Sequence, residues 1–220
     1  MLPPESLDEL LDRARAIAGR TLGDLAREQG IDLADDGVRT KGKFGQLVER
    51  ALGGAGSSKS EHDFPAIATE LKTIPLGPRG PIESTYVCTL PLAATDTMTW
   101  EASWVRAKLA RVLFVPVWSV DPAWRGRRIG NAVLFEPTEA QEAVLRADFE
   151  EVVGLCGAGR AEEVDARLGR WLQVRPKAAN GRVRTTTRAE DGEIVSTIPR
   201  GFYLRTRFTG AVLRDPRATP

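Results

Sequence analysis

The chain has few of the residues from which metal centres and cystine frameworks are usually built. Its 220 residues include one histidine and two cysteines. A single histidine, His62, leaves no second one for a histidine-paired metal centre, so we interpret it as a polar loop residue. The two cysteines, Cys88 and Cys156, cannot form a zinc site alone and provide no disulfide framework. We expect both to be buried thiols.

Long hydrophobic runs are also missing. No segment approaches the length of a membrane span, and residues 1–5 have neither the basic region nor the apolar core of a signal peptide. We therefore expect a cytoplasmic protein that does not contact a membrane. A hydrophobic content of 42% and a charged content of 28% are ordinary for a soluble protein, and the length allows one large domain or two small lobes.

The net charge is only +1, which argues against a surface that is basic throughout. The charge is nevertheless unevenly distributed. From Arg170 to the C-terminus eleven Arg and Lys residues accompany four Asp and Glu residues, whereas from Glu136 to Asp165 nine acidic residues accompany two basic ones. This pattern fits a protein with one face that contacts phosphate groups. A solvated arginine-rich tail would explain it equally well.

The residues with the clearest chemical potential are Asp63, Glu70 and Lys72. The segment from Ile67 to Leu76 predicts a strand, and residues two apart in a strand point to the same side, so Glu70 and Lys72 share a face. Carboxylates are ligands for Mg²⁺, and a lysine can orient water or neutralise charge on phosphorus, so the group indicates a phosphodiester-cleaving site. Such spacing also arises by chance, and solvated residues on an edge strand are the alternative.

One glycine-rich segment resembles a phosphate-binding P-loop. Residues 53–60 lack only the glycine that this motif needs at Ser58. A P-loop follows a strand and opens a helix, whereas this segment follows a predicted helix and leads to a loop. We therefore interpret it as a flexible linker.

The remaining patterns predict a mixed α and β chain. Helices are expected at 6–19, where Ser6 and Glu9 form a capping box, and at 21–30, 41–52, 101–111, 138–153 and 162–168. Strands are expected at 67–76, 84–90, 113–120, 131–135, 171–174 and 201–205. The polar stretch 177–195 is expected to be a mobile surface element. Glu49 lies on the flank of the apolar stripe of 41–52, and periodicity alone favours a surface position over an inward one.

Five blocks of sequence, in order, resemble the MutH family. They are Glu61-His62-Asp63-Phe64, Glu70-Leu71-Lys72-Thr73-Ile74-Pro75, Val105-Arg106-Ala107-Lys108-Leu109, Arg175-Pro176-Lys177-Ala178-Ala179-Asn180 and Pro199-Arg200-Gly201-Phe202-Tyr203-Leu204. This family comprises strand-nicking endonucleases of methyl-directed DNA mismatch repair, related in fold to type II restriction enzymes. The resemblance extends from the first helix to about Leu213, and five ordered blocks are far more specific than one nuclease motif.

The resemblance implies a fold and a catalytic site. The fold would be α/β with a mixed sheet, a type II restriction endonuclease-like fold, in which residues 1–220 form one nuclease domain. A catalytic lobe of about 1–100 and a DNA-reading lobe of 101–220 would flank a DNA-binding cleft. Asp63, Glu70 and an additional acidic residue, Glu49, match the carboxylates that hold Mg²⁺. Lys72 matches the catalytic lysine, and Lys108 matches a further lysine near the cleaved phosphate.

The resemblance also assigns DNA contacts. Arg175, Pro176 and Lys177 match a loop that reads base edges of GATC, where an arginine or lysine can donate to guanine. Tyr203 matches an aromatic residue near the adenine whose methylation blocks cutting. Lys41 and Gly42 resemble a further DNA-contacting pair.

The implied activity is Mg²⁺-dependent nicking of the unmethylated strand of double-stranded DNA at hemimethylated GATC sites. The implied partners are MutL, as the activator, and MutS indirectly. A monomer suits the cutting of one strand. Two other functions stay open: a stand-alone restriction-type endonuclease that cuts GATC without MutL, and a catalytically silent DNA-binding module. The silent module is disfavoured because every residue of the metal site is present.

Overall fold

The computed structural model describes residues 1–31, 42–54, 56, 61–177 and 182–219. The chain divides into two compact units, each built from separate stretches of sequence. The first unit contains Met1–Glu83, Ala110–Glu136 and Val212–Pro216, and the second contains Ser84–Leu109, Pro137–Ala211 and Arg217–Pro220. Helices and a mixed sheet confirm the predicted α/β class. The division into lobes of 1–100 and 101–220 stays a prediction.

The sheet of the first unit is built around two parallel strands, β1 (Glu70–Gly77) and β4 (Val112–Trp118). Glu70 lies opposite Val112 and Lys72 opposite Phe114. Three short strands add to it in antiparallel fashion: β2 (Gly80–Pro81) beside β1, and β5 (Arg128–Ile129) and β6 (Val133–Phe135) beside β4. Six of the seven residues of β4 are buried, which is typical of a central strand covered on both faces.

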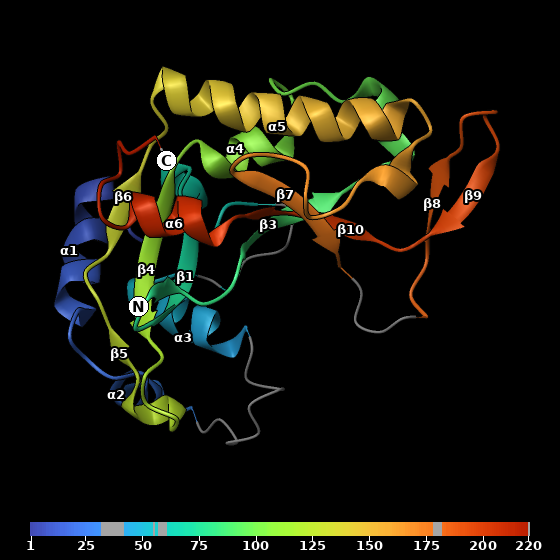
Figure 1. Cartoon of the computed structure of the whole chain (residues 1–220). Coiled ribbons are helices and arrows are strands. Elements are labelled where there is room, and N and C mark those ends of the chain that lie inside the picture. Colours follow the sequence, from blue (N-terminus) through green and yellow to red (C-terminus); the bar gives the residue numbers. More distant parts are fainter. Residues whose placement is uncertain (32–41, 55, 57–60, 178–181, 220) are drawn as a thin grey trace. The chain divides into compact units, whose positions relative to one another are not determined.

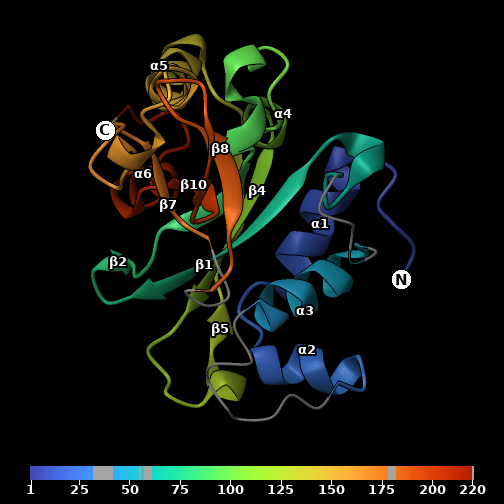
Figure 2. The same cartoon turned by 90° about the vertical axis from the view of Figure 1, so that its right-hand side faces the viewer.

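Three helices, α1 (Leu7–Ile17), α2 (Leu22–Glu28) and α3 (Lys43–Leu52), lie on one side of this sheet (Figure 2). Their apolar faces meet Leu71 and Leu113 in one buried cluster. The hydroxyl of Ser6 caps α1 by accepting from the Glu9 N–H, as predicted. The Glu9 carboxylate, however, accepts from the Glu5 N–H at 2.8 Å, so the predicted reciprocal bond of the capping box is replaced by one to the preceding residue.

The predicted start of β1 at Ile67 is wrong. Pro65–Ile67 form a short 3₁₀ helix, and Ala68 has a left-handed backbone with φ of 46°. Proline favours the first position of a helical turn because its φ is already fixed there. The chain then turns back on itself, and Phe64 pairs with Thr69 through two backbone hydrogen bonds before β1 begins at Glu70.

The second unit contains an antiparallel sheet in the order β3 (Thr85–Leu90), β10 (Arg200–Leu204) and β7 (Leu172–Pro176). The long helix α5 (Glu139–Gly157) covers one face of it (Figure 1), and Phe149 stacks on Phe202 with ring centroids 5.7 Å apart. The predicted capping box of α5 is confirmed, with Thr138 and Gln141 each bonding to the backbone N–H of the other.

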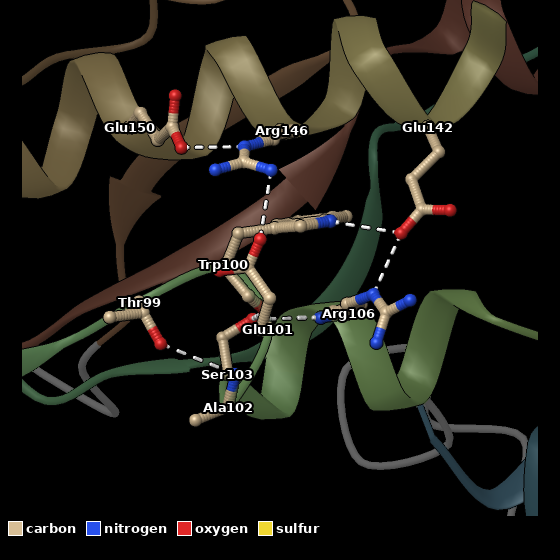
Figure 3. A network of polar contacts seen from close by, with 9 residues as sticks. All are labelled: Thr99, Trp100, Glu101, Ala102, Ser103, Arg106, Glu142, Arg146 and Glu150. Atoms are coloured by element: carbon tan, nitrogen blue, oxygen red, sulfur yellow. Dashed lines mark hydrogen bonds and ion pairs between the residues drawn. The ribbon is translucent and has the colours of Figure 1, made fainter. Parts of the chain in front are cut away.

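A network of ion pairs joins α5 to α4 (Trp104–Leu109) and to the segment before it (Figure 3). One Glu142 oxygen accepts from Arg106 Nε at 2.7 Å and from Trp100 Nε1 at 3.0 Å. Arg146 pairs with Glu101 and with Glu150. These contacts hold the two helices of this unit together at their exposed edge. The predicted helix start at residue 101 is too early: residues 101 and 102 lie in a turn, and α4 begins at Trp104, after Ser103, whose Oγ accepts from the Arg106 N–H at 3.0 Å.

The helix expected at 162–168 is wrong, whereas the mobility expected for 177–195 stays a prediction. The helix expected at 162–168 is only a 3₁₀ turn, η4 (Ala161–Glu163), because the Asp165 carboxylate accepts from the Arg167 N–H and holds a turn. The stretch 177–195 contains a hairpin of β8 (Thr185–Arg188) and β9 (Ile194–Thr197), closed by a turn in which Gly192 has φ of 87° (Figure 1). Runs of β-branched residues, 185–187 and 194–195, are typical of strands and indicate this hairpin.

Three further helical elements complete the described part of the chain: η2 (Leu92–Thr97), η3 (Trp124–Gly126) and α6 (Thr206–Val212). Cys88 and Cys156 are free and buried, as predicted. Over the described residues, no helix combines the length and apolar character that crossing a membrane requires.

Candidate functional site

Glu70 and Lys72 lie on the same face of β1, as the strand periodicity predicted. Lys72 Nζ donates to Glu70 Oε1 at 2.6 Å. The Glu70 side chain is 2% exposed and that of Lys72 is 16% exposed, so the pair is largely shielded from water. A buried ion pair contributes little net stability because both charges lose hydration, and its retention is more typical of a functional site.

Asp63 reaches the same strand from the chain reversal that precedes it. Its Oδ2 accepts a hydrogen bond from the Leu71 N–H at 2.7 Å. Leu71 is the residue between Glu70 and Lys72, so the Asp63 carboxylate is fixed beside the strand segment that carries both. The turn at Pro65–Ile67 and Ala68 creates this proximity, which a simple strand from Ile67 would not.

Glu49 is buried on α3, with 7% of the residue exposed, so the surface position favoured by periodicity is wrong. Its Oε1 accepts from the Gly56 N–H at 2.9 Å. Gly54 lies against the same side chain: a Cβ at this position would come within 2.4 Å of Glu49 Cγ. α3 packs closely on β1, since a Cβ on Gly45 would stand 3.5 Å from Thr73 Oγ1. The catalytic role of Glu49 stays a prediction.

The three carboxylates have the donor chemistry that Mg²⁺ requires, because hard cations bind carboxylate oxygens. In the part of the chain that the structure describes, no group of three or more His, Cys, Asp and Glu side chains is arranged to hold a metal ion. One oxygen each of Asp63, Glu70 and Glu49 accepts from a protein donor, respectively Leu71 N, Lys72 Nζ and Gly56 N. Metal binding by these residues stays a prediction.

Three of the predicted DNA-reading residues, Arg175, Lys177 and Tyr203, gather in the second unit on the face of the β3-β10-β7 sheet opposite α5, and Pro176 lies between the first two in the chain. Tyr203 on β10 pairs with Gln173 on β7 and with Tyr86 on β3, while Gly201 pairs with Arg175. Phe202 and Leu204, which alternate with them, are fully buried. Arg175 and Pro176, at the end of β7, and Lys177, directly after it, are exposed. The sheet therefore brings Tyr203 and the residues 175–177 together.

Tyr86 is part of this face, and sequence reasoning missed it. Its ring meets Tyr203 edge-on at 5.3 Å between centroids, and Lys177 Nζ lies 3.9 Å from its centroid. Gly201 permits this packing, because a Cβ there would come within 2.9 Å of the Tyr86 ring. Burial, and then the neighbouring Tyr86, raise the pKa of Tyr203 above its ordinary value of 10.0. Alternation along 84–90 placed Tyr86 on a strand face but did not show which residues oppose it.

Three predicted residues remain: Lys108, Gly42 and Lys41. Lys108, on α4 of the second unit, is 6% exposed and its Nζ lies 5.3 Å from the Trp104 ring centroid. Its proximity to a cleaved phosphate stays a prediction. Gly42 precedes α3 with φ of 92°, a conformation suited to glycine. Lys41 lies outside the described residues, as do positions 55 and 57–60 of the glycine-rich linker.

Comparison with known proteins identifies relatives along nearly the entire chain. The DNA mismatch repair protein MutH of Shewanella amazonensis is 48% identical over 216 residues, which cover 97% of this chain and 96% of the relative. MutH of Shewanella baltica is 46% identical over 215 residues with the same coverage. The chain belongs to the MutH family. The family model described as DNA mismatch repair enzyme MutH matches residues 52–148, which contain Asp63, Glu70, Lys72 and Lys108.

Membership of the MutH family confirms the predicted function at the level of a DNA mismatch repair endonuclease. It also confirms the restriction-endonuclease-like fold. MutH-family membership implies that the enzyme acts on DNA, works with repair partners and depends on a divalent metal ion.

Proposed function

We propose that this protein nicks the unmethylated strand of double-stranded DNA at hemimethylated GATC sites, with Mg²⁺ as its metal ion and MutL as its activator. In this proposal the enzyme is a cytoplasmic monomer, and MutS acts on it indirectly. The observation that best supports this proposal is the arrangement at β1. Lys72 Nζ lies 2.6 Å from Glu70 Oε1, both side chains are shielded from water, and Asp63 accepts a hydrogen bond from the N–H of Leu71, which stands between them. Membership of the MutH family supports the same proposal.

The catalytic residues have distinct tasks in this proposal. Asp63, Glu70 and Glu49 would hold the ion, whose bound form polarises a phosphate oxygen and lowers the pKa of water. Lys72 is positioned by Glu70 and has two further ammonium hydrogens with which to orient the attacking water or contact the phosphate. Lys108 would neutralise charge near the cleaved bond. The low exposure of Glu70 and Lys72 strengthens these electrostatic interactions, because little water screens them.

Recognition of GATC is assigned to the face that carries Tyr203, Arg175, Pro176 and Lys177, with Lys41 and Gly42 as further contacts. Arginine and lysine can donate to O6 and N7 of guanine in the major groove. A methyl group on adenine N6 would alter the fit against Tyr203, whose hydroxyl is protonated at neutral pH. Discrimination between methylated and unmethylated strands would follow from this contact.

The test is nicking of a supercoiled plasmid that carries GATC sites, prepared unmethylated, hemimethylated and fully methylated. Each form is incubated with and without Mg²⁺, and with and without MutL and ATP. Nicking of the unmethylated strand alone, stimulated by MutL, is the expected result. Lys72→Ala is the matched inactive control.

The other outcomes discriminate between functions. Efficient double-strand cutting without MutL would show a restriction-type enzyme instead. Retention of binding to GATC duplexes with no cutting under any condition would show a binding module. Full activity of Lys72→Ala would remove the lysine on β1 from the mechanism.

A further inference from the structure

The loop that leads into β7 is fixed from both sides of its backbone, by two charged side chains that come from distant parts of the sequence. This loop, residues 166–172, joins the turn at Asp165 to the strand that ends in Arg175 and Pro176. The two side chains are Asp148 from α5 and Arg205, the residue directly after β10. All of these residues belong to the second unit.

Asp148 binds the N–H groups of the loop. Its Oδ1 accepts from Arg170 N at 2.6 Å, and its Oδ2 accepts from Trp171 N at 2.6 Å and from Leu172 N at 2.8 Å. The residue is 5% exposed. A buried carboxylate that accepts three backbone hydrogen bonds is well compensated for its lost hydration, and its geometry is tightly defined by them.

Arg205 binds the carbonyl groups of the same loop. Its guanidinium donates to the carbonyl oxygens of residues 166, 167, 168 and 169 at 2.8 to 3.1 Å. Its backbone N–H donates to Trp171 O at 2.8 Å. The planar guanidinium, with five donors in a fixed arrangement, can bind several carbonyls at once, which a lysine ammonium cannot do in the same geometry.

The consequence reaches the DNA-reading face. Leu172 is the first residue of β7 and pairs with Leu204, the last residue of β10 and the neighbour of Arg205. From this fixed end the antiparallel register continues to Gln173 opposite Tyr203 and Arg175 opposite Gly201. A shift at the start of β7 would therefore displace the side chains at its end, since they follow on one continuous strand.

We propose that Asp148 and Arg205 are positioning residues for sequence recognition: they fix the loop 166–172 and so set where Arg175 of β7, and Lys177 directly after it, lie relative to Tyr203. This inference rests on the proposed function, because it takes the β3-β10-β7 face as the surface that reads GATC. Neither residue contacts DNA in this account. Their effect is on selectivity for GATC rather than on the bond-breaking step.

Asp148→Asn and Arg205→Lys are the informative variants. Asparagine has nearly the same shape as aspartate but carries one NH₂ group, which would face a backbone N–H where an acceptor is needed. Arg205→Lys keeps the charge and loses most of the carbonyl contacts, and it provides a second variant if Asp148→Asn folds poorly. The control is Thr138→Ala, which removes the N-cap of the same helix α5 and lowers stability without touching the loop.

The measurement is kcat/KM for nicking short duplexes that contain GATC or the same site with one base pair changed. The selectivity ratio is kcat/KM on GATC divided by kcat/KM on the altered site. For both variants we expect this ratio to fall by about 10-fold or more, mainly through a higher KM on GATC, as expected when a base contact is misplaced. Thr138→Ala should lower Tm and leave the ratio unchanged. In a protein that already carries Arg175→Ala, the substitution Asp148→Asn should reduce the ratio by less than it does in the unsubstituted protein, because both substitutions act through the same contact.

The outcomes separate this inference from the proposed function. If the unsubstituted protein itself does not distinguish GATC from the altered site, the proposed function is overturned and this inference with it. If the unsubstituted protein discriminates while Asp148→Asn and Arg205→Lys lower Tm and keep the ratio, the two residues are structural only. Equal losses of the ratio in the variants and in Thr138→Ala would lead to the same conclusion.

Discussion

Replacing Gly54 with alanine is expected to displace the Glu49 carboxylate without removing it. A Cβ at Gly54 would stand 2.4 Å from Glu49 Cγ, 2.9 Å from Oε1 and 3.1 Å from Cδ. Non-bonded carbon atoms prefer about 3.5–4.0 Å, so Cγ has to move by roughly 1 Å or more. The backbone of Gly54 itself does not have the left-handed φ that would penalise alanine, so the clash is the main effect.

The expected loss is larger in activity than in stability. Overpacking of this kind lowers the free energy of unfolding by about 1–3 kcal/mol. A misplacement of about 1 Å in a group that holds a metal ion or orients a substrate reduces the rate by about 100-fold. The hydrogen bond from the Gly56 N–H to Glu49 Oε1 at 2.9 Å would also be strained or lost.

The assay is single-turnover nicking of a GATC plasmid over a range of Mg²⁺ concentrations, with urea unfolding measured in parallel. Gly45→Ala is the matched control, since its Cβ would stand 3.5 Å from Thr73 Oγ1, an ordinary contact, and alanine favours the helix. We expect Gly54→Ala to be about 100-fold slower and Gly45→Ala to keep its activity. A folded Gly54→Ala protein that nicks at the normal rate would refute the inward role of Glu49.

Three further outcomes follow from the described contacts. Lys72→Ala should lower nicking by at least about 100-fold while gel-shift binding to GATC duplexes persists, because the lysine acts on the reacting groups. Nicking by Lys72→Ala at the normal rate would contradict this role. The Arg106 hydrogen bond, and then that from Trp100, hold the pKa of Glu142 below its ordinary value of 4.5. Glu142→Gln should therefore cost about 0.5–1 kcal/mol in urea unfolding at neutral pH, discounted because the side chain is 33% exposed. This difference should persist above the ordinary pKa and vanish as pH falls through the folded-state pKa; a pH-independent difference would refute it. Burial raises the pKa of the Cys156 thiol to about 11, so iodoacetamide at mildly alkaline pH should label it only after unfolding, as mass spectrometry would show.

Several features were accessible from sequence because they depend on local geometry. The caps at Ser6 and Thr138 and the apolar faces of α1 and α5 follow from helical spacing. The shared face of Glu70 and Lys72 follows from the two-residue period of a strand. The similarity to the MutH family assigned roles that no spacing could supply, and the comparisons confirmed the family.

Other predictions failed because hydrogen bonds that periodicity does not include, some of them between distant residues, redirected the chain. The prediction of a helix at 162–168 failed for two reasons: Asp165 holds a local turn with Arg167, and Arg205 binds the carbonyls of 166–169, a contact that local propensity does not include. The prediction that β1 starts at Ile67 failed because Pro65 and Ala68 form a turn that pairs Phe64 with Thr69. In both cases a hydrogen-bonded alternative competed successfully with the regular element.

The sequence by itself determined the family, the nuclease chemistry and the strand that carries Glu70 and Lys72. Only the tertiary structure decided that Glu49 is buried, that Tyr86 lies against Tyr203 and Lys177, and that Asp148 holds the start of β7. The physical reason is that periodicity specifies which face of an element a residue occupies, whereas the partner of that face depends on how the elements pack.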